Sequence, residues 1–531
     1  MSLIIKNLSY EHSNREVLFE NISFSIREGQ KLGLVGNNGV GKSTLMKILN
    51  SELLPSSGEI VSSDRIYYIP QHFGQYNNLT VSQALKIDNK LKALQGITEG
   101  DASVENFAIL NDDWTIEERA SSALGAWGLE YISLEQSFDK LSGGEKTKTF
   151  LAGISIHEPD IVLMDEPTNH LDFFWRKHLY DMIINSRSAM LIISHDRTLL
   201  NLLSEIYELN RDGIVYYAGN YESYKSEKEL MMNSLQAQLE EKQKQLRIAK
   251  KTAIETAERK QKHEARGKKN NIKKGVGKMA MDTFQDKAEK SATKLKDIHA
   301  DKMNTLSDNI SIIRQAIPDM NTMKVDFNTS DLHIGKILVD AKDINFSYGN
   351  ENQLWSKPLS FQIKSGERIA LKGENGSGKS TLLKLITNQL FPTKGNLNCS
   401  DFKYTYLDQE YSLVKNNLTV LEQVQMFNEG QFEDYEIKTI LNRFLFSSDT
   451  WDKLCEKLSG GEKMKLALCC LMIGGNTPDM FILDEPTNNI DIQNVEILTS
   501  TIKDFRGTIL VVSHDQYFLE QIGIDYSIEL S

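Results

Sequence analysis

The sequence lacks any apolar run long enough to cross a membrane. Apolar stretches such as residues 161–164 and 481–483 are far shorter than the ~18 residues that a transmembrane helix needs. The first residues, MSLIIKNLSYEH, contain no basic region followed by an apolar core, so they do not resemble a secretory signal. These absences predict a cytoplasmic protein without a membrane domain.

Cysteine is also scarce, and the four cysteines show no zinc-ligand spacing. Two of them are adjacent, which is a poor geometry for a structural disulfide. We therefore expect reduced thiols. The cysteines are Cys399, Cys455, Cys469 and Cys470.

The 531 residues, of which 25% are charged and 40% hydrophobic, have an ordinary globular composition. At roughly 100–200 residues per domain, the length allows about three domains. The composition excludes a collagen-like chain, a disulfide scaffold and a wholly disordered protein.

The net charge of −12 is unevenly distributed. Residues 241–302 contain 19 Lys and Arg against nine Asp and Glu, whereas the remainder contains 42 against 64. An acidic body with a basic middle segment indicates that the middle meets a polyanion such as nucleic acid. A solvated helical surface is the alternative, because lysine-rich helices are common.

Four motifs occur twice, once on each side of the basic segment. GNNGVGKST, LSGGEK, LMDEPTNHLD and IISHD recur as GENGSGKST, LSGGEK, ILDEPTNNID and VVSHD. Two copies of one domain are therefore expected. The first copy has about 20 more residues between its first two motifs, which we place as an insertion at about 86–115.

The first motif has the pattern of a phosphate-binding P-loop, because it follows a strand-like run and precedes a helical one. Its glycines let backbone N–H groups approach phosphates, its lysine reaches the β- and γ-phosphates, and its serine holds Mg²⁺. The predicted ATP-binding residues are Gly36, Asn37, Asn38, Gly39, Val40, Gly41, Lys42, Ser43 and Thr44, with Gly373, Glu374, Asn375, Gly376, Ser377, Gly378, Lys379, Ser380 and Thr381. Ser43 and Ser380 are the predicted metal ligands among them.

Two buried strands, IVLMD and MFILD, each end in a carboxylate. Asp165 and Asp484 are predicted to contact Mg²⁺, directly or through water. The following residues, Glu166 and Glu485, are placed to orient or deprotonate the attacking water. The alternative is that each glutamate only supports the neighbouring metal-binding aspartate. A histidine follows each aspartate by 30 residues, and we expect these histidines, His195 and His514, to contact the γ-phosphate rather than to be ordinary surface histidines.

The LSGGE motif precedes a helical run and adds a second cradle of backbone N–H groups. Because each P-loop already forms a complete phosphate cradle, the second cradle makes sense if it closes on ATP held by the other copy. Together these motifs resemble those of ATP-binding-cassette (ABC) ATPases. That resemblance implies a head-to-tail pair in which Lys42 faces Ser459 and Gly461, and Lys379 faces Ser142 and Gly144. It also implies further ATP-binding and metal-binding residues. These are the signature residues Ser142, Gly143, Gly144, Glu145, Ser459, Gly460, Gly461 and Glu462, the metal-binding glutamines Gln71 and Gln409, and the adenine-stacking Tyr10 and Tyr348.

The basic middle segment shows two apolar seams with 3-4 spacing, separated by the glycine-containing stretch GKKNNIKKGVGKM. The first seam includes Leu239, and the second includes Leu306 and Ile310. This pattern predicts an antiparallel coiled-coil hairpin. A long lever with a basic tip suits structured RNA, where phosphate charge dominates affinity. A flexible spacer is the alternative. The predicted RNA-binding residues of the tip are Arg266, Lys268, Lys269, Lys273, Lys274 and Lys278.

Over essentially its whole length the chain is similar to the F subfamily of ABC proteins (ABC-F). The expected fold is therefore α/β: two tandem P-loop ABC domains, 1–224 and 336–531, joined by a helical hairpin, 225–335, with its tip at about 265–282. The resemblance implies a Mg²⁺-dependent ATP hydrolase with two composite sites, acting as a monomer whose cassettes pair within the chain.

The same resemblance implies a ribosomal partner, with rRNA and P-site tRNA contacts near the exit site and the linker directed at the peptidyl-transferase centre. Such proteins regulate translation or protect ribosomes from antibiotics. Two alternatives remain open at this stage: a DNA-repair ATPase that binds branched DNA, and the ATPase subunit of a membrane importer.

Overall fold

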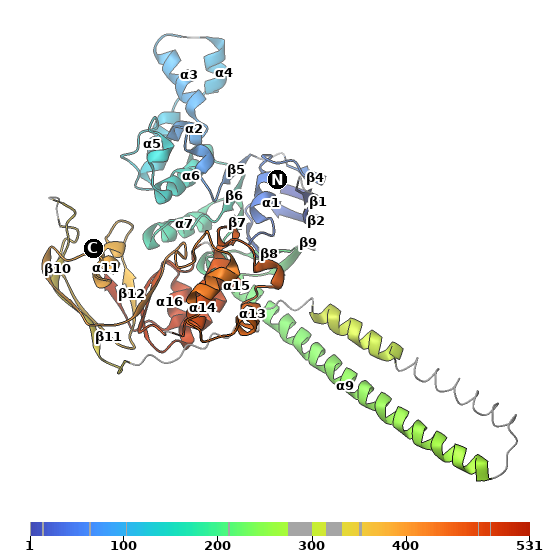
Figure 1. Cartoon of the computed structure of the whole chain (residues 1–531). Helices are drawn as coiled ribbons and strands as arrows, with labels where there is room; N and C mark the ends of the chain where they lie inside the picture. The colour runs from blue at the N-terminus through green and yellow to red at the C-terminus, as the bar shows by residue number, and fades with distance from the viewer. Residues whose placement is uncertain are drawn as a thin grey trace. The chain divides into compact units, whose positions relative to one another are not determined.

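The computed structural model describes residues 2–12, 15–62, 65–101, 103–210, 213–273, 300–314, 332–349, 353–475, 477–488 and 490–530. The chain divides into two compact units. One comprises Met1–Tyr224 with Met323–Ser531, and the other is Lys225–Thr322. The first unit contains two copies of one α/β arrangement (Figure 1), so the two tandem cassettes expected from the repeat are confirmed.

The first cassette is built on a six-stranded sheet in the order β5-β6-β7-β3-β8-β9. All its strands are parallel except β9, which pairs antiparallel with β8. Apolar runs such as AMLII are buried on both faces, as a central parallel sheet requires. The strands are β5 (Ile66–Ile69), β6 (Ile161–Asp165), β7 (Ala189–Ile193), β3 (Lys31–Val35), β8 (Glu205–Asn210) and β9 (Gly213–Ala218).

A second, antiparallel sheet of the first cassette has the order β2-β1-β4. Its strand β2 alternates between buried and exposed residues, which is typical of a sheet with one face on the core. One hydrophobic core of the cassette lies between this antiparallel sheet and the parallel sheet, and it includes residues of helix α1. The strands are β1 (Ser2–Glu11), β2 (Val17–Arg27) and β4 (Ser57–Val61).

The helices of the first cassette include a pair, α3 and α4, in the region where the sequence predicts an insertion (Figure 1). Lys90 and Arg119 each form an ion pair of 2.8 Å with Asp113 at the base of this pair. The helices are α1 (Lys42–Leu49), α2 (Val81–Ala84), α3 (Asp88–Thr98), α4 (Val104–Leu110), α5 (Ile116–Gly125), α6 (Gly143–His157), α7 (Phe173–Asn185) and α8 (Arg197–Asn201), with 3₁₀ turns η1 (Gly74–Tyr76) and η2 (Phe138–Lys140).

The second cassette repeats this plan with sheets β11-β10-β13 and β14-β15-β16-β12-β17. In the described part of this cassette no strand pairs with the outer edge of β17, the position that β9 takes beside β8 in the first cassette. The strands are β10 (Ile337–Asn345), β11 (Leu359–Lys364), β12 (Arg368–Lys372), β13 (Lys394–Cys399), β14 (Tyr404–Leu407), β15 (Met480–Asp484), β16 (Thr508–Val512) and β17 (Tyr526–Glu529). The helices are α11 (Lys379–Ile386), α12 (Val420–Phe427), α13 (Asp434–Arg443), α14 (Gly460–Ile473), α15 (Ile492–Asp504) and α16 (Gln516–Ile522), with 3₁₀ turns η4 (Ser448–Thr450) and η5 (Cys455–Lys457).

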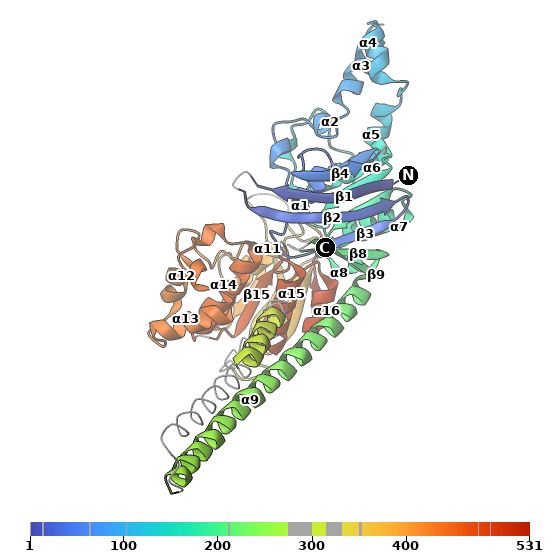
Figure 2. The same cartoon turned by 90° about the vertical axis from the view of Figure 1, so that its right-hand side faces the viewer.

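The second unit contains the long helix α9 (Tyr221–Lys273), whose first residues belong to the first unit, and a helix at residues 300–314. The shorter helix lies alongside the early part of α9 in both views (Figures 1 and 2). Helix α9 has 53 residues, which at 1.5 Å per residue gives about 80 Å. Leu239, Leu306 and Ile310 are buried, and all three lie at positions of the predicted apolar seams.

The helix α9 continues past Gly267 to Lys273, so placing the start of the glycine-containing break at Gly267 was wrong. A single glycine costs a helix only about 1 kcal/mol, which the long helix on its N-terminal side can offset. The predicted tip at about 265–282 therefore begins as helix, and its remainder, from residue 274, lies outside the described residues.

Among the described residues, no helix combines the length and apolar character that a membrane span requires. All four cysteines are free, and three of them are buried, as expected for reduced thiols.

Candidate active sites

The first P-loop connects β3 to α1, as its sequence predicts. Gly36, Gly39 and Gly41 have positive φ angles of 148°, 82° and 102°, a region that favours glycine. A Cβ on Gly41 would lie 2.7 Å from a side-chain carbon of Leu18. The Nζ of Lys42 donates to the carbonyl oxygens of Gly36 at 2.6 Å and Asn37 at 3.1 Å, so the lysine lies across the loop.

The second P-loop, between β12 and α11, has a similar geometry, with positive φ at Gly376 and Gly378 but not at Gly373. The Nζ of Lys379 donates to the carbonyl oxygens of Gly373 at 2.7 Å and Glu374 at 2.9 Å. Burial lowers the pKa of Lys379, while nearby carboxylates, Glu485 first among them, oppose the shift. In both loops the ammonium group lies where a phosphate would replace its carbonyl partners.

Asp165 and Glu166 lie at the carboxyl end of β6, and Asp484 and Glu485 lie at the end of β15. Both glutamates have a left-handed backbone, with φ of 53° for Glu166 and 50° for Glu485. Such a conformation costs a non-glycine residue about 1 kcal/mol or more and is concentrated at functional sites. The backbone N–H of each glutamate donates to the carbonyl of the neighbouring strand, at 2.9 Å to Ile193 and 2.8 Å to Val512.

Each glutamate contacts the predicted histidine of its own cassette. The Nε2 of His195 lies 3.2 Å from Oε1 of Glu166, and the Nε2 of His514 lies 3.3 Å from Oε1 of Glu485. The histidine backbone N–H donates to the other carboxylate oxygen, at 3.1 Å in the first cassette and 3.4 Å in the second. The structure therefore brings the predicted base and the predicted γ-phosphate contact together twice.

Burial dominates the electrostatics of these pairs. Burial, with a contribution from the Asp165 carboxylate, raises the pKa of Glu166 to about 8. Burial raises the pKa of Glu485 to about 7, and the guanidinium of Arg176 opposes this shift. Burial lowers the pKa of His195 to about 3 and that of His514 to about 3, so both imidazoles are neutral near pH 7. A neutral imidazole carries one N–H, which it can donate to an oxygen anion.

The residues around Asp165 fit a magnesium ion. Its Oδ2 is buried without a hydrogen-bond partner among the described residues, and its carboxylate is hydrogen-bonded to Ser43. Carboxylate, hydroxyl and amide oxygens are the donors that Mg²⁺ prefers. Tyr68 is hydrogen-bonded to Asp165, and Tyr406 donates to Asp484 at 2.7 Å. Sequence reasoning missed both tyrosines, although each lies on the strand-like run before the predicted glutamine.

A pocket of about 370 Å³ lies over the first P-loop. It brings together residues predicted separately from three repeated motifs of the first cassette and the predicted glutamine Gln71, together with a serine of the second cassette's LSGGE motif. Those predicted residues are Asn38, Gly39, Gly41, Lys42, Ser43, Thr44, Gln71, Asp165, Glu166, His195 and Ser459. Gln409, the second predicted glutamine, lies in the turn after β14.

The two predicted adenine-stacking tyrosines differ in placement. Tyr348 is half-exposed, and its hydroxyl lies 2.8 Å from Oγ1 of Thr381 in the second P-loop helix. Tyr10 is partly buried against Phe19, and it is absent from the pocket lining, where His12 is found instead. His12 contacts Tyr10 edge-on with ring centroids 5.5 Å apart. Sequence reasoning missed His12, which lies two residues after the matched tyrosine.

Reciprocal contacts join each P-loop to the other cassette. The backbone N–H of Asn38 donates to Oδ2 of Asp491 at 3.4 Å, and that of Asn375 donates to Oδ2 of Asp172 at 3.4 Å. A Cβ on Gly144 would lie 3.9 Å from Nδ2 of Asn375, which places the first LSGGE motif at the second P-loop. The two aspartates end the repeated DEPTN motifs, so the repetition was the signal that could have identified them.

Both LSGGE motifs begin helices with a capping box. The Ser142 and Ser459 hydroxyls each accept from the backbone N–H of the glutamate three residues on, at 3.3 Å in both cassettes. In return, the carboxylate of Glu145 or Glu462 accepts a hydrogen bond from the serine backbone N–H, at 2.7 or 2.8 Å. The remaining N–H groups of the helix start, Gly143–Gly144 and Gly460–Gly461, are left for an external anion.

The predicted RNA-binding residues lie apart from these sites. Arg266 is exposed on α9, and Lys268, Lys269 and Lys273 fall within the bounds of that helix. Lys274 and Lys278 lie outside the described residues.

Arg176 makes the two sites unequal. It is 7% exposed, and its guanidinium donates across the cassette boundary to the carbonyl oxygen of His514 at 3.4 Å. It also lies 3.7 Å from Oδ2 of Asp196. The aligned residue of the second cassette, four after Asp491, is Val495. The Lys379 site therefore receives a cation from the other cassette that the Lys42 site does not.

We expect Arg176→Met to slow hydrolysis at the Lys379 site by about tenfold, because a hydrogen bond from a charged donor contributes roughly 1.5–3 kcal/mol. The Lys42 site should change by less than about twofold. The measurement compares ATPase rates of the substitution in Glu166→Gln and in Glu485→Gln backgrounds, each leaving one predicted base. Lys177→Met, which removes an exposed cation from the same helix, is the control. Equal losses in both backgrounds would show that Arg176 is merely structural.

Comparisons with known proteins agree with this geometry. The sequence model described as ABC transporter matches residues 19–169 and 356–488. The putative ATP-binding protein YdiF of Bacillus subtilis is 30% identical over 96% of this chain and 77% of its own length. ABC transporter F family member 5 of Arabidopsis thaliana is 28% identical over 98% of this chain and 73% of its own.

Among solved structures, the complex of the archaeal ribosomal stalk protein aP1 with the archaeal ribosome recycling factor aABCE1 contains a similar chain. The TM-score is 0.58 at 19% identity, over 98% of this chain and 87% of that one. At this identity the likeness concerns the fold.

Proposed function

Because this chain belongs to the ABC-F subfamily of ATP-binding-cassette ATPases, we propose that it couples ATP hydrolysis at two composite sites to an action on the ribosome. The chain is an ATP hydrolase that uses Mg²⁺, as its family is. The observation that carries the composite sites is the presence of Ser459 in the pocket over Lys42. We assign 1–224 and 336–531 to the cassettes and 225–335 to the linker.

In each site the P-loop lysine and the loop N–H groups bind the phosphates, and Ser43 with Asp165, or Ser380 with Asp484, would hold Mg²⁺. Gln71 and Gln409 are proposed to complete these ligand sets. The ion, when bound, neutralises phosphate charge as it develops. Closure of the opposite signature motif then excludes water from the nucleotide.

Glu166 and Glu485 are proposed to orient the attacking water and to accept its proton. Their position is defined by two contacts from the histidine, one from the backbone N–H and one from Nε2. When nucleotide enters, the neutral imidazole of His195 or His514 would donate its N–H to the γ-phosphate. Oε1 of each glutamate has no hydrogen-bond partner among the described residues, so this oxygen is available to the attacking water.

The ribosome is proposed as the partner because the linker combines length with positive charge. Helix α9 is about 80 Å long and carries Arg266 exposed near its end. Phosphate contacts of such residues would supply salt-dependent affinity for RNA. The similar archaeal chain is titled a ribosome recycling factor, which supports the same partner here. We propose that the linker points toward P-site tRNA and the peptidyl-transferase centre, where it regulates translation or protects the ribosome from antibiotics.

Deleting residues 267–278 tests this function. Basal ATPase activity should be unchanged, because no site residue lies there. The effect on peptide-bond formation or drug release should be lost, and ribosome binding should become less dependent on salt, since each lost phosphate contact lowers the slope. The measurements are ATPase rate, ribosome binding at several salt concentrations, and translation with and without antibiotic.

A matched variant separates length from charge: glutamine in place of Lys268, Lys269, Lys273, Lys274 and Lys278 keeps the full length. Full activity of the deletion variant would show that the linker is a spacer. Preferential binding of branched DNA over ribosomes in a competition assay would instead favour a DNA-repair ATPase.

A further inference from the structure

The last residue of each LSGGEK motif is a lysine that takes no part in the nucleotide contacts described above. The sequence NNLTV also occurs once in each cassette, and its first asparagine accepts a hydrogen bond from this lysine. The Nζ of Lys146 lies 2.9 Å from Oδ1 of Asn77, and the Nζ of Lys463 lies 2.9 Å from Oδ1 of Asn416. The paired residues are 69 positions apart in the first cassette and 47 in the second, so the same contact forms although the intervening chain differs in length.

Each NNLTV segment is fixed beside the chain that leads into the LSGGEK motif. The backbone N–H of Phe138 donates to the carbonyl oxygen of Leu79 at 2.9 Å, and that of Cys455 donates to the carbonyl oxygen of Leu418 at 2.9 Å. The threonine of each segment also starts a helix, α2 or α12, with a capping box. The asparagine at the beginning of the segment is therefore presented to the lysine from a fixed backbone.

The lysine lies one helical turn beyond the serine that caps the helix. The backbone N–H of Lys146 donates to the carbonyl oxygen of Ser142, and that of Lys463 donates to the carbonyl oxygen of Ser459, both at 2.9 Å. The lysine thus follows directly on the first turn, whose free N–H groups are available to an anion. A hydrogen bond from its ammonium group to the amide ties this end of the helix to the NNLTV segment.

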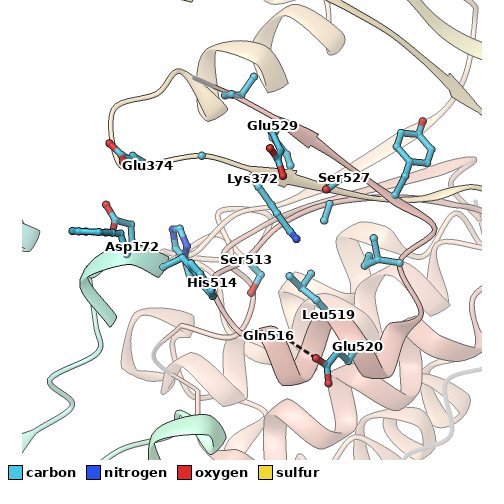
Figure 3. Close-up of a pocket in the computed structure, with 18 of the residues that line it drawn as sticks. Asp172, Lys372, Glu374, Ser513, His514, Gln516, Leu519, Glu520, Ser527 and Glu529 are labelled. Carbon is cyan, nitrogen blue, oxygen red and sulfur yellow. Dashed lines mark hydrogen bonds between the residues drawn. The ribbon is translucent and has the colours of Figure 1, made fainter. Parts of the chain in front are cut away.

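Each LSGGEK motif adjoins the nucleotide site of the other cassette. For the first motif, Nδ2 of Asn375 in the second P-loop donates to the carbonyl oxygen of His170 at 3.1 Å, and a Cβ on Gly144 would lie 2.9 Å from the same oxygen. Figure 3 shows Asp172 of the first cassette and His514 of the second at one end of the same pocket. A residue that fixes the first LSGGEK motif should therefore act on the site of the second cassette, and the reverse should hold for the second motif.

We propose that Asn77 and Asn416 are positioning residues for ATP hydrolysis, each holding the LSGGEK motif that completes the site of the opposite cassette. Each asparagine acts through the lysine of its own cassette rather than on the nucleotide. The assignment rests on the composite sites of the proposed function. Removing one amide should slow hydrolysis at the other cassette's site and spare the site of its own cassette.

The test measures ATPase rates of asparagine variants of the full chain with one predicted base removed. With Glu166→Gln only the Lys379 site turns over, and Asn77→Ala should lower its kcat about fivefold. KM should change little, because the P-loop still binds nucleotide and only closure is impaired. With Glu485→Gln only the Lys42 site turns over, and Asn77→Ala should change its rate by less than about 1.5-fold.

The second cassette supplies the reciprocal test. Asn416→Ala should slow the Lys42 site about threefold and spare the Lys379 site, and the loss is smaller because the hydrogen bond of Asn416 is exposed to solvent. Asn78→Ala and Asn417→Ala, which change the exposed second asparagine of each NNLTV sequence, are the matched controls. Both controls should leave the two rates within about 1.5-fold of their values without the change.

Rescue separates positioning from a general loss of structure. Asn77→Asp retains an acceptor oxygen at the same distance from the backbone, so it should keep the rate at the Lys379 site within about twofold. In a chain with both predicted bases intact, Asn77→Ala combined with Lys146→Met should be no slower than the slower single variant, since both changes break one contact. Thermal melting establishes that each variant is folded.

A loss at the Lys379 site that Asn77→Asp restores, with the Lys42 site unaffected, would establish Asn77 as a positioning residue. Equal losses at both sites, a loss no larger than that of Asn78→Ala, or additive effects of the Asn77 and Lys146 changes would overturn the proposal. A loss confined to the Lys42 site would instead contradict the composite sites on which the proposal rests, so the two failures give different results.

Discussion

Replacing Glu166 and Glu485 together by glutamine should reduce ATP hydrolysis by about 100- to 1000-fold while ATP binding is retained. Glutamine preserves the size of the side chain and its acceptor oxygen, so the contact from the histidine backbone N–H can persist. It removes the carboxylate that would take the proton from water.

Hydrolysis would be measured as phosphate release and binding by equilibrium titration with labelled ATP. Glutamine in place of the exposed Glu117 and Glu456 is the matched control for the loss of two charges. Because hydrolysis would no longer open the cassettes, expression of the double variant should arrest protein synthesis if the ribosome is the partner. Hydrolysis at the unmodified rate would show that neither glutamate is the base.

Ser459→Arg should impair nucleotide binding at the Lys42 site by more than about tenfold, although residue 459 belongs to the other cassette. The pocket over Lys42 is about 370 Å³, and Ser459 lines it. An arginine there would fill space that the nucleotide needs and would prevent closure. Ser142→Arg should have the reciprocal effect on the Lys379 site, since Gly144 lies next to Asn375 of that P-loop.

Photo-crosslinking of an ATP analogue, followed by cleavage between the cassettes, would show which half is labelled in each variant. Ser459→Asn, which retains a capping side chain, controls for the cost of about 1 kcal/mol from losing the helix cap. Each arginine variant is also the control for the other. Loss of labelling in the same cassette that carries the arginine would contradict the head-to-tail arrangement.

The two sites are chemically similar but have different surroundings. Arg176 reaches the second site, whereas Val495 occupies the aligned position near the first. The Lys42 side chain is buried, while that of Lys379 is half-buried. Unequal turnover at the two sites is therefore the expected behaviour, and the Arg176→Met comparison measures the part of that inequality that comes from one cation.

The sequence by itself determined the P-loops, the buried strands β6 and β15 and the capped helices α6 and α14. Each depends on local chemistry: positive φ at Gly41 and Gly378, continuous apolar residues on a strand covered on both faces, and a serine with a glutamate three residues later. These features can be predicted from sequence because the residues that interact in each of them are only a few positions apart along the chain.

Only the tertiary structure decided which residues meet across the cassettes. Asp491 and Asn38 are 453 residues apart, and Arg176 and His514 are 338 apart, so no periodicity links them. The placement of His12 rather than Tyr10 in the first pocket depends on how β1 and β2 pack beside the P-loop.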